Sequence, residues 1–144
     1  MFKLFKVVLA VLLAFATLFA KEPDGNKKYD IDISRMSGTM VYGQVYQMVM
    51  YPSKYLGKHI KMKGIFSSYY DEELKRRFYG CVIADALACC SQGLAFELAK
   101  PRKYPEQYPA EGDAIVVEGD FDYEKDEGGS GFPIIRNAEM QTEK

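Results

Sequence analysis

The sequence predicts an all-β domain, a small β-barrel of five strands, with one N-terminal accessory α-helix after a signal peptide. Three observations lead to this prediction. Residues 1–20 have the charge and hydropathy order of an export signal, residues 37–51 have an apolar period near 3.6, and the segments after Gly57 alternate with a period of two. The expected organisation is a signal peptide at 1–20, a flexible lead-in at 21–36 and one barrel domain at 37–144.

The first twenty residues have the pattern of a secretory signal. Two lysines lie within the first six residues, and the 14 residues of Val7–Ala20 carry no charge. A membrane-spanning helix needs roughly 20 apolar residues, so this stretch is too short for a comfortable anchor. Cleavage after Ala16 or Ala20 fits the small side chains, and Ala20 is favoured because Lys21 opens the polar chain. The sequence therefore predicts a periplasmic or secreted protein with no stable membrane span after cleavage.

The composition restricts the partners of the exported chain. Cleavage removes Lys3 and Lys6, which lowers the basic side chains from 19 to 17 against 20 acidic ones, a formal charge of −3. Binding of nucleic acid depends largely on clustered Lys and Arg that neutralise phosphates. Mild acidity and export together disfavour nucleic acid as a partner. We expect an unknown protein or small ligand outside the cytoplasm.

An amphipathic helix is expected after the polar lead-in of residues 21–36. Apolar side chains recur at spacings of three and four residues on one face: Met40, Val41, Val45, Met48 and Val49. Ser37 or Thr39 is a candidate cap at its start, and Pro52 marks its end. This helix is expected to pack against the strands that follow it.

Five strands are expected after the helix, at about 60–66, 77–85, 93–99, 113–124 and 132–140. In the first, Ile60 and Met62 alternate with two lysines, which predicts a half-buried strand with its lysines outward. The connection over residues 100–111 contains three prolines and is expected to be irregular.

An internal repeat relates the first and fourth strands. Residues 57–66 and 112–121 align without gaps on the pattern G, charge, x, I, x, apolar, charge, G, x, F. The equivalent Gly64 and Gly119 predict a bend at the same place in each strand, as a small closed barrel requires. Pairing of the two strands would bring together outward side chains of opposite charge, Lys61 and Lys63 from one and Glu118 and Asp120 from the other.

Five strands, two of them glycine-bent, with one accessory helix resemble the OB-fold over residues 37–140. In that fold the first and fourth strands are neighbours, which agrees with the charge pattern. Many OB-folds place a helix between strands three and four, where this chain has prolines, so the helix at 37–51 is expected to cover the barrel end instead. Residues 77–93, with their vicinal cysteines, also look like uncharacterised exported bacterial proteins of OB-like fold.

The OB-fold resemblance implies a binding face on strands two and three and on two loops, here about 67–76 and 124–131. Four tyrosines lie at or near these segments: Tyr69, Tyr70, Tyr79 and Tyr123. Tyrosines at a barrel mouth stack on ligands or anchor protein partners. The alternative interpretation is that they only cap the hydrophobic core.

Three cysteines remain after cleavage, and three interpretations of them stay open. Cys81, mid-strand, is a small buried packing residue in the first, with Cys89 and Cys90 either reduced or in one disulfide. In the second, Cys89 and Cys90, together with Asp85, Cys81 or His59, bind zinc or copper. In the third, the vicinal pair forms a strained, reducible disulfide. Outside the metal interpretation no cofactor is expected.

Catalysis has little support in the sequence. His59 is the single histidine and is expected to be outward, solvated and without a role, and no GxSxG, HExxH or P-loop pattern occurs. The prediction is an exported OB-fold-like binding module with no catalytic role and an unidentified ligand. The alternative is an extracytoplasmic metal-handling or thiol-redox protein that uses Cys89 and Cys90.

Overall fold

The computed structural model describes residues 28–84, 90–125 and 128–143, so the predicted signal peptide lies outside the described residues. The described chain is mostly β-sheet, with one α-helix, which confirms the all-β prediction in outline. The elements in chain order are β1 (Ile31–Asp32), α2 (Gly38–Met50), the 3-10 helix η1 (Pro52–Lys54), β2 (His59–Asp71), β3 (Arg76–Ala84), β4 (Ser91–Leu98), β5 (Ala114–Lys125) and β6 (Gly131–Thr142).

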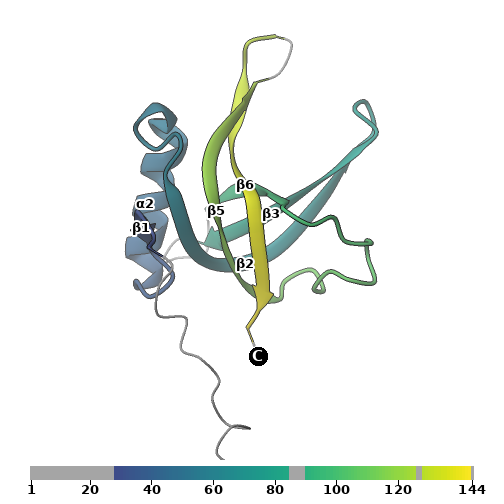
Figure 1. Ribbon diagram of the computed structural model, residues 1–144, viewed down its shortest axis with the longest axis horizontal. Helices are drawn as coiled ribbons and strands as arrows, with labels where there is room; N and C mark the ends of the chain where they lie inside the picture. The colour runs from purple at the N-terminus through teal and green to yellow at the C-terminus, as the bar shows by residue number, and fades with distance from the viewer. Residues whose placement is uncertain (1–27, 85–89, 126–127, 144) are drawn as a thin grey trace, which may run out of the picture.

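The strands of this described part form one sheet in the order β1-β2-β3-β4-β6-β5, and β2 also pairs with β5 (Figure 1). The five long strands therefore follow one another in a ring. β4 and β6 are parallel, and the other pairs within the ring are antiparallel. The five predicted strands correspond to β2 to β6, and the short β1 is additional.

The predicted contact between the two repeat segments is confirmed in part. β2 and β5 pair antiparallel with Lys61 opposite Glu118, and Lys61 Nζ lies 3.5 Å from Glu118 Oε2. Lys63 lies opposite Val116 rather than an acidic residue of β5, and it forms an ion pair with Glu143. In an antiparallel register the two copies run in opposite directions, so Lys63 moves away from Asp120 as the strand continues.

The two repeat glycines lie where neighbouring strands approach too closely for a side chain. A Cβ at Gly64 would lie 2.7 Å from Cys81 Sγ and 2.7 Å from the Val82 carbonyl oxygen. A Cβ at Gly119 would lie 2.6 Å from the Arg136 carbonyl oxygen, and the β5–β6 register shifts at this residue. Both glycines are therefore required by the curvature of the ring.

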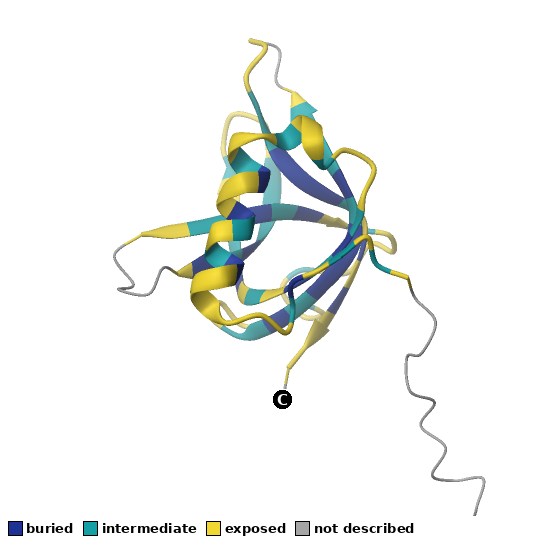
Figure 2. Cartoon of the chain, turned by 90° about the vertical axis from the view of Figure 1, so that its left-hand side faces the viewer, coloured by how far each residue is buried: buried dark blue, intermediate teal, exposed yellow. Residues whose placement is uncertain are grey.

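Helix α2 packs on β3, β4 and β6 and buries Val41, Val45 and Met48, which confirms the predicted helix (Figure 2). Met40 was expected on the same face but is 59% exposed. Ser37 occupies the N-cap position without a side-chain capping hydrogen bond. No helix of the described residues is both long and apolar enough to span a membrane.

The expected flexible lead-in over residues 21–36 is wrong for its last part. Ile31–Asp32 pairs parallel with β2, and Ile33 is fully buried in the core. The Ile33 amide donates to the Lys61 carbonyl oxygen at 2.9 Å. Burial of one isoleucine side chain contributes about 1.5–3 kcal/mol, which offsets part of the cost of ordering this short polar segment.

The proline-rich connection between β4 and β5 has no helix, as predicted, and covers part of the core with aromatic side chains. Tyr104 and Tyr108 pack against the core cluster. Ser68 on β2 fixes the end of the connection, because its hydroxyl and amide both donate to the Glu111 carboxylate, at 2.6 and 3.0 Å. The connection thereby positions Tyr108 against the sheet.

Candidate functional site

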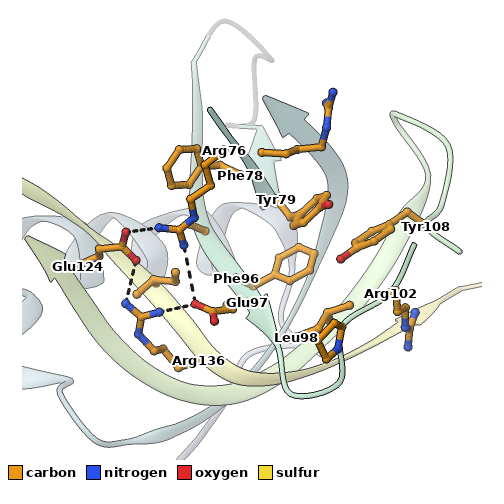
Figure 3. A pocket seen from close by; sticks show the side chains of 14 residues that line it. Arg76, Phe78, Tyr79, Phe96, Glu97, Leu98, Arg102, Tyr108, Glu124 and Arg136 are labelled. Carbon is orange, nitrogen blue, oxygen red and sulfur yellow. Dashed lines mark hydrogen bonds and ion pairs between the residues drawn. The ribbon is translucent and has the colours of Figure 1, made fainter. Parts of the chain in front are cut away.

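A cleft of about 610 Å³ lies on β3 and β4 and extends over β6 to the β4–β5 connection (Figure 3). Arg76 and Phe78 are two residues apart on β3, so their side chains leave the same face of the sheet. Arg136 on β6 reaches the same space. The residues labelled in the figure are Arg76, Phe78, Tyr79, Phe96, Glu97, Leu98, Arg102, Tyr108, Glu124 and Arg136.

One end of the cleft is a charged lattice, formed by Arg76, Arg136, Glu97, Asp122 and Glu124. Arg76 Nη1 lies 2.6 Å from Glu124 Oε1, and Arg136 Nη2 lies 2.8 Å from Glu124 Oε2. Arg136 Nε donates to Asp122 at 3.1 Å, and its Nη1 donates to Glu97. Four strands contribute to the lattice, and one guanidinium joins three carboxylates.

The lattice favours the charged forms of Glu124 and Arg136. Burial raises the pKa of Glu124, but hydrogen bonds from Arg76 and Arg136 and their charges outweigh it, so this pKa is below its usual value. Burial lowers the pKa of Arg136, and hydrogen bonds with Glu124 and Asp122 more than reverse this effect. Glu124 therefore acts in the lattice as a fixed acceptor, and Arg136 as a fixed donor.

The middle of the cleft is aromatic. The Tyr79 and Tyr108 rings stack at 4.3 Å between centroids and 14° between planes, and Phe96 lies 6.1 Å from Tyr79. Burial, and then the hydrogen bond and charge of Tyr79, raise the pKa of Tyr108, with Arg102 acting in the opposite direction. Tyr108 therefore stays a neutral phenol and presents a flat apolar face.

The other end of the cleft carries a positive charge. Arg102 Nη2 donates to the Met140 carbonyl oxygen at 3.2 Å, and Arg102 forms no ion pair with any described residue. Arg77 is held differently, since its guanidinium lies 4.2 Å from the Tyr104 ring centroid and donates to Ser68 Oγ at 3.1 Å. Four arginines and two glutamates line the cleft, so cations exceed anions there.

The four predicted ligand-binding tyrosines do not form one site. Tyr79 lines the cleft, and it also shares a separate hollow of about 270 Å³ with Tyr69. Tyr69 and Tyr70 are exposed on β2 and do not line the cleft itself. Tyr123 is half-buried on β5 and also lies outside the lining. Tyr108 carries no signal in the sequence that marks it as a site residue, because its position depends on the path of an irregular connection.

His59 is expected to be solvated, but its side chain is only 34% exposed and makes specific contacts; that it has no functional role stays a prediction. Its Nδ1 lies 2.9 Å from Asp120 Oδ1, and its ring stacks on Tyr29 at 5.7 Å between centroids. The hydrogen bond with His59, followed by one from Asn137, lowers the pKa of Asp120. The reason is the β2–β5 register, which places His59 directly opposite Asp120. This arrangement links β2, β5 and β6 and the segment before β1.

Of the residues predicted to bind a metal or form a disulfide, only some lie within the described part of the chain. Cys81 is fully buried, and burial raises the pKa of its thiol to about 12, which agrees with the packing interpretation. Cys90 is exposed immediately before β4, while Cys89 and Asp85 lie outside the described residues. Within the described ranges no three His, Cys, Asp or Glu side chains form a group that could hold a metal. The zinc, copper and thiol-redox interpretations of Cys89 and Cys90 stay predictions.

In comparisons with known proteins, no family model matches the chain and no curated protein is significantly similar to it. The function of the cleft is therefore inferred from its own chemistry.

Proposed function

We propose that this chain is an exported binding module with an OB-fold-like arrangement and no catalytic role, and that its ligand occupies the cleft. The strand pairing supports the first part, because β2 and β5 are the first and fourth long strands and are neighbours, as the OB-fold resemblance implies. The position of the cleft supports the second part. Its floor includes β3 and β4, the second and third long strands, which form the usual binding face of that fold.

The observation that carries the proposal is the stacked Tyr79–Tyr108 pair beside Arg102, a cation that forms no ion pair in the described chain. A flat apolar group fits against the two rings, and an acidic group of the same ligand reaches the guanidinium. We therefore propose an acidic ligand that contains a ring or another flat apolar portion.

The charged lattice at the opposite end supports binding rather than catalysis. The pKa of Glu124 is held below its usual value by hydrogen bonds from Arg76 and Arg136, so this carboxylate lacks the raised pKa that general acid–base catalysis near neutral pH favours. A lattice held by several ion pairs instead gives a rigid rim with fixed donors and acceptors, which favours selection among ligands.

Titration with the aromatic anion 8-anilinonaphthalene-1-sulfonate tests the proposal, with calorimetry as the readout. We expect saturable binding to one site on the unaltered chain. Tyr108→Ala removes half of the stacked pair and should weaken binding about tenfold, or about 1.4 kcal/mol. Arg102→Gln should also weaken binding, because it removes the attraction for the sulfonate while leaving the exposed position polar.

Tyr69→Ala is the matched control, since Tyr69 is an exposed tyrosine outside the cleft and its loss should leave binding unchanged. Cooperative unfolding of each variant must be retained, because a loosened core binds this dye without a specific site. Equal affinity in the unaltered chain and in the Tyr108 and Arg102 variants would contradict the proposal.

A further inference from the structure

Helix α2 exposes three large apolar side chains, together with Thr39, Gly43 and Gln47, on the side opposite the one that packs on the sheet. At 100° per residue, Met40, Tyr46 and Met50 fall within about one third of the helix circumference, on the side away from the buried valines. Figure 2 shows this outer side facing solvent along the helix. Tyr51 and Leu56 extend the exposed apolar surface beyond the helix, and all five side chains are 42–59% exposed.

The stretch of chain that forms this face contributes charges of one sign. No Asp or Glu occurs between Asp32 and Asp71, and α2 itself contains no charged residue. Lys54 Nζ lies 4.6 Å from the Tyr51 ring centroid, and Lys58 Nζ lies 6.0 Å from that of Tyr55. Neither lysine forms an ion pair within the described residues. Both charges therefore stand beside apolar surface with no acidic partner.

We propose that this α2 surface, comprising Met40, Tyr46, Met50, Tyr51, Leu56 and the flanking Lys54 and Lys58, docks on a membrane of anionic lipids. Apolar side chains of an interfacial helix enter the boundary between headgroups and acyl chains, and tyrosines are favoured at that depth. Lysines beside them attract anionic headgroups while their stems cover apolar surface. Residues 33–70 contribute no acidic side chain that anionic headgroups would repel.

The same charges disfavour a second copy of this chain as the occupant. If two copies packed their α2 surfaces together about a twofold axis, Arg35, Lys54 and Lys58 of one would be brought toward the same cations of the other. Like charges placed opposite one another across an interface are costly. A lipid surface supplies the opposite charge over the whole width of the patch.

A single tryptophan gives a direct test, because the chain contains none. In Tyr51→Trp, we expect the emission to move to shorter wavelength when vesicles of phosphatidylglycerol and phosphatidylcholine in equal parts are added, and to stay unchanged with phosphatidylcholine alone. Tyr69→Trp is the matched control, since Tyr69 belongs to β2 near the hairpin that projects away from α2 (Figure 1). Its emission should not change with either vesicle.

Lys54→Gln combined with Lys58→Gln should weaken vesicle binding about 25-fold, because each cation near an anionic leaflet contributes roughly fivefold in affinity. Both lysines are exposed, so this variant should unfold like the parent chain. The proposal is overturned if the emission of the Tyr51→Trp variant does not respond to anionic vesicles, or if the lysine variant binds them equally. A concentration-dependent dimer that blocks vesicle binding would also overturn it in favour of a protein occupant.

Discussion

Replacing Gly64 by alanine tests whether the bend in β2 requires the absence of a side chain. The added Cβ would lie 2.7 Å from Cys81 Sγ and 2.7 Å from the Val82 carbonyl oxygen, well inside normal contact distance. The thiol can rotate away, but the carbonyl oxygen belongs to the paired strand β3 and moves only with its backbone. Overpacking of this kind costs about 1–3 kcal/mol, and contact with backbone favours the upper part of that range.

Gly43→Ala is the matched control, because the same methyl group is added in the exposed part of α2. No heavy atom lies within 4 Å of the position that its Cβ would take. Alanine is favoured over glycine inside a helix by about 0.8–1.0 kcal/mol, so this variant should be more stable than the parent chain.

Urea unfolding followed by circular dichroism measures both effects. The two variants should differ in free energy of unfolding by about 2–4 kcal/mol, with opposite signs relative to the parent chain. A Gly64→Ala variant as stable as the parent would refute the claim that close strand approach requires this glycine.

Two further predictions follow from the titrating groups. Burial raises the pKa of the Cys81 thiol to about 12, so this thiol should resist a thiol reagent at pH 8 in the folded chain and react on unfolding. Rapid labelling of Cys81 in the folded chain, located by mass spectrometry, would contradict this prediction. The pKa of Asp120 is lowered by its hydrogen bonds with His59 and Asn137, so its stabilising contribution is present above its unfolded pKa near 3.8 and is lost as the pH falls through the folded pKa. The difference in unfolding free energy between the parent chain and Asp120→Asn should therefore shrink below about pH 4, and a difference independent of pH would count against the His59 contact.

The periodicity of the sequence is sufficient to predict the helix and the five long strands, because burial on one face imposes a period on each. It does not predict that Ile33 joins the core, since a two-residue strand has no period. The spacing of Met40 places it at the edge of the helix face that is buried, and the pattern therefore predicts that Met40 is buried too. Its actual exposure depends on how α2 is rotated against the sheet.

The residues of the candidate site are harder to predict from the sequence than the helix and the strands. The alternating pattern and the OB-fold resemblance indicate Tyr79, but the charged lattice joins residues that are far apart in the sequence, from Arg76 to Arg136. Only the strand order brings these side chains together. Tyr108 lies in a proline-rich connection whose path is fixed by local turns and by the contact of Glu111 with Ser68. Neither type of contact leaves a periodic signal.

The most direct test of ligand binding in the cleft is to map bound 8-anilinonaphthalene-1-sulfonate by amide chemical shifts on the full chain. The largest changes on titration should come from β3 residues 76–79, β4 residues 95–98 and the connection near Tyr108. Saturable changes confined to α2, or absent from β3 and β4, would contradict the assignment of the cleft as the binding site.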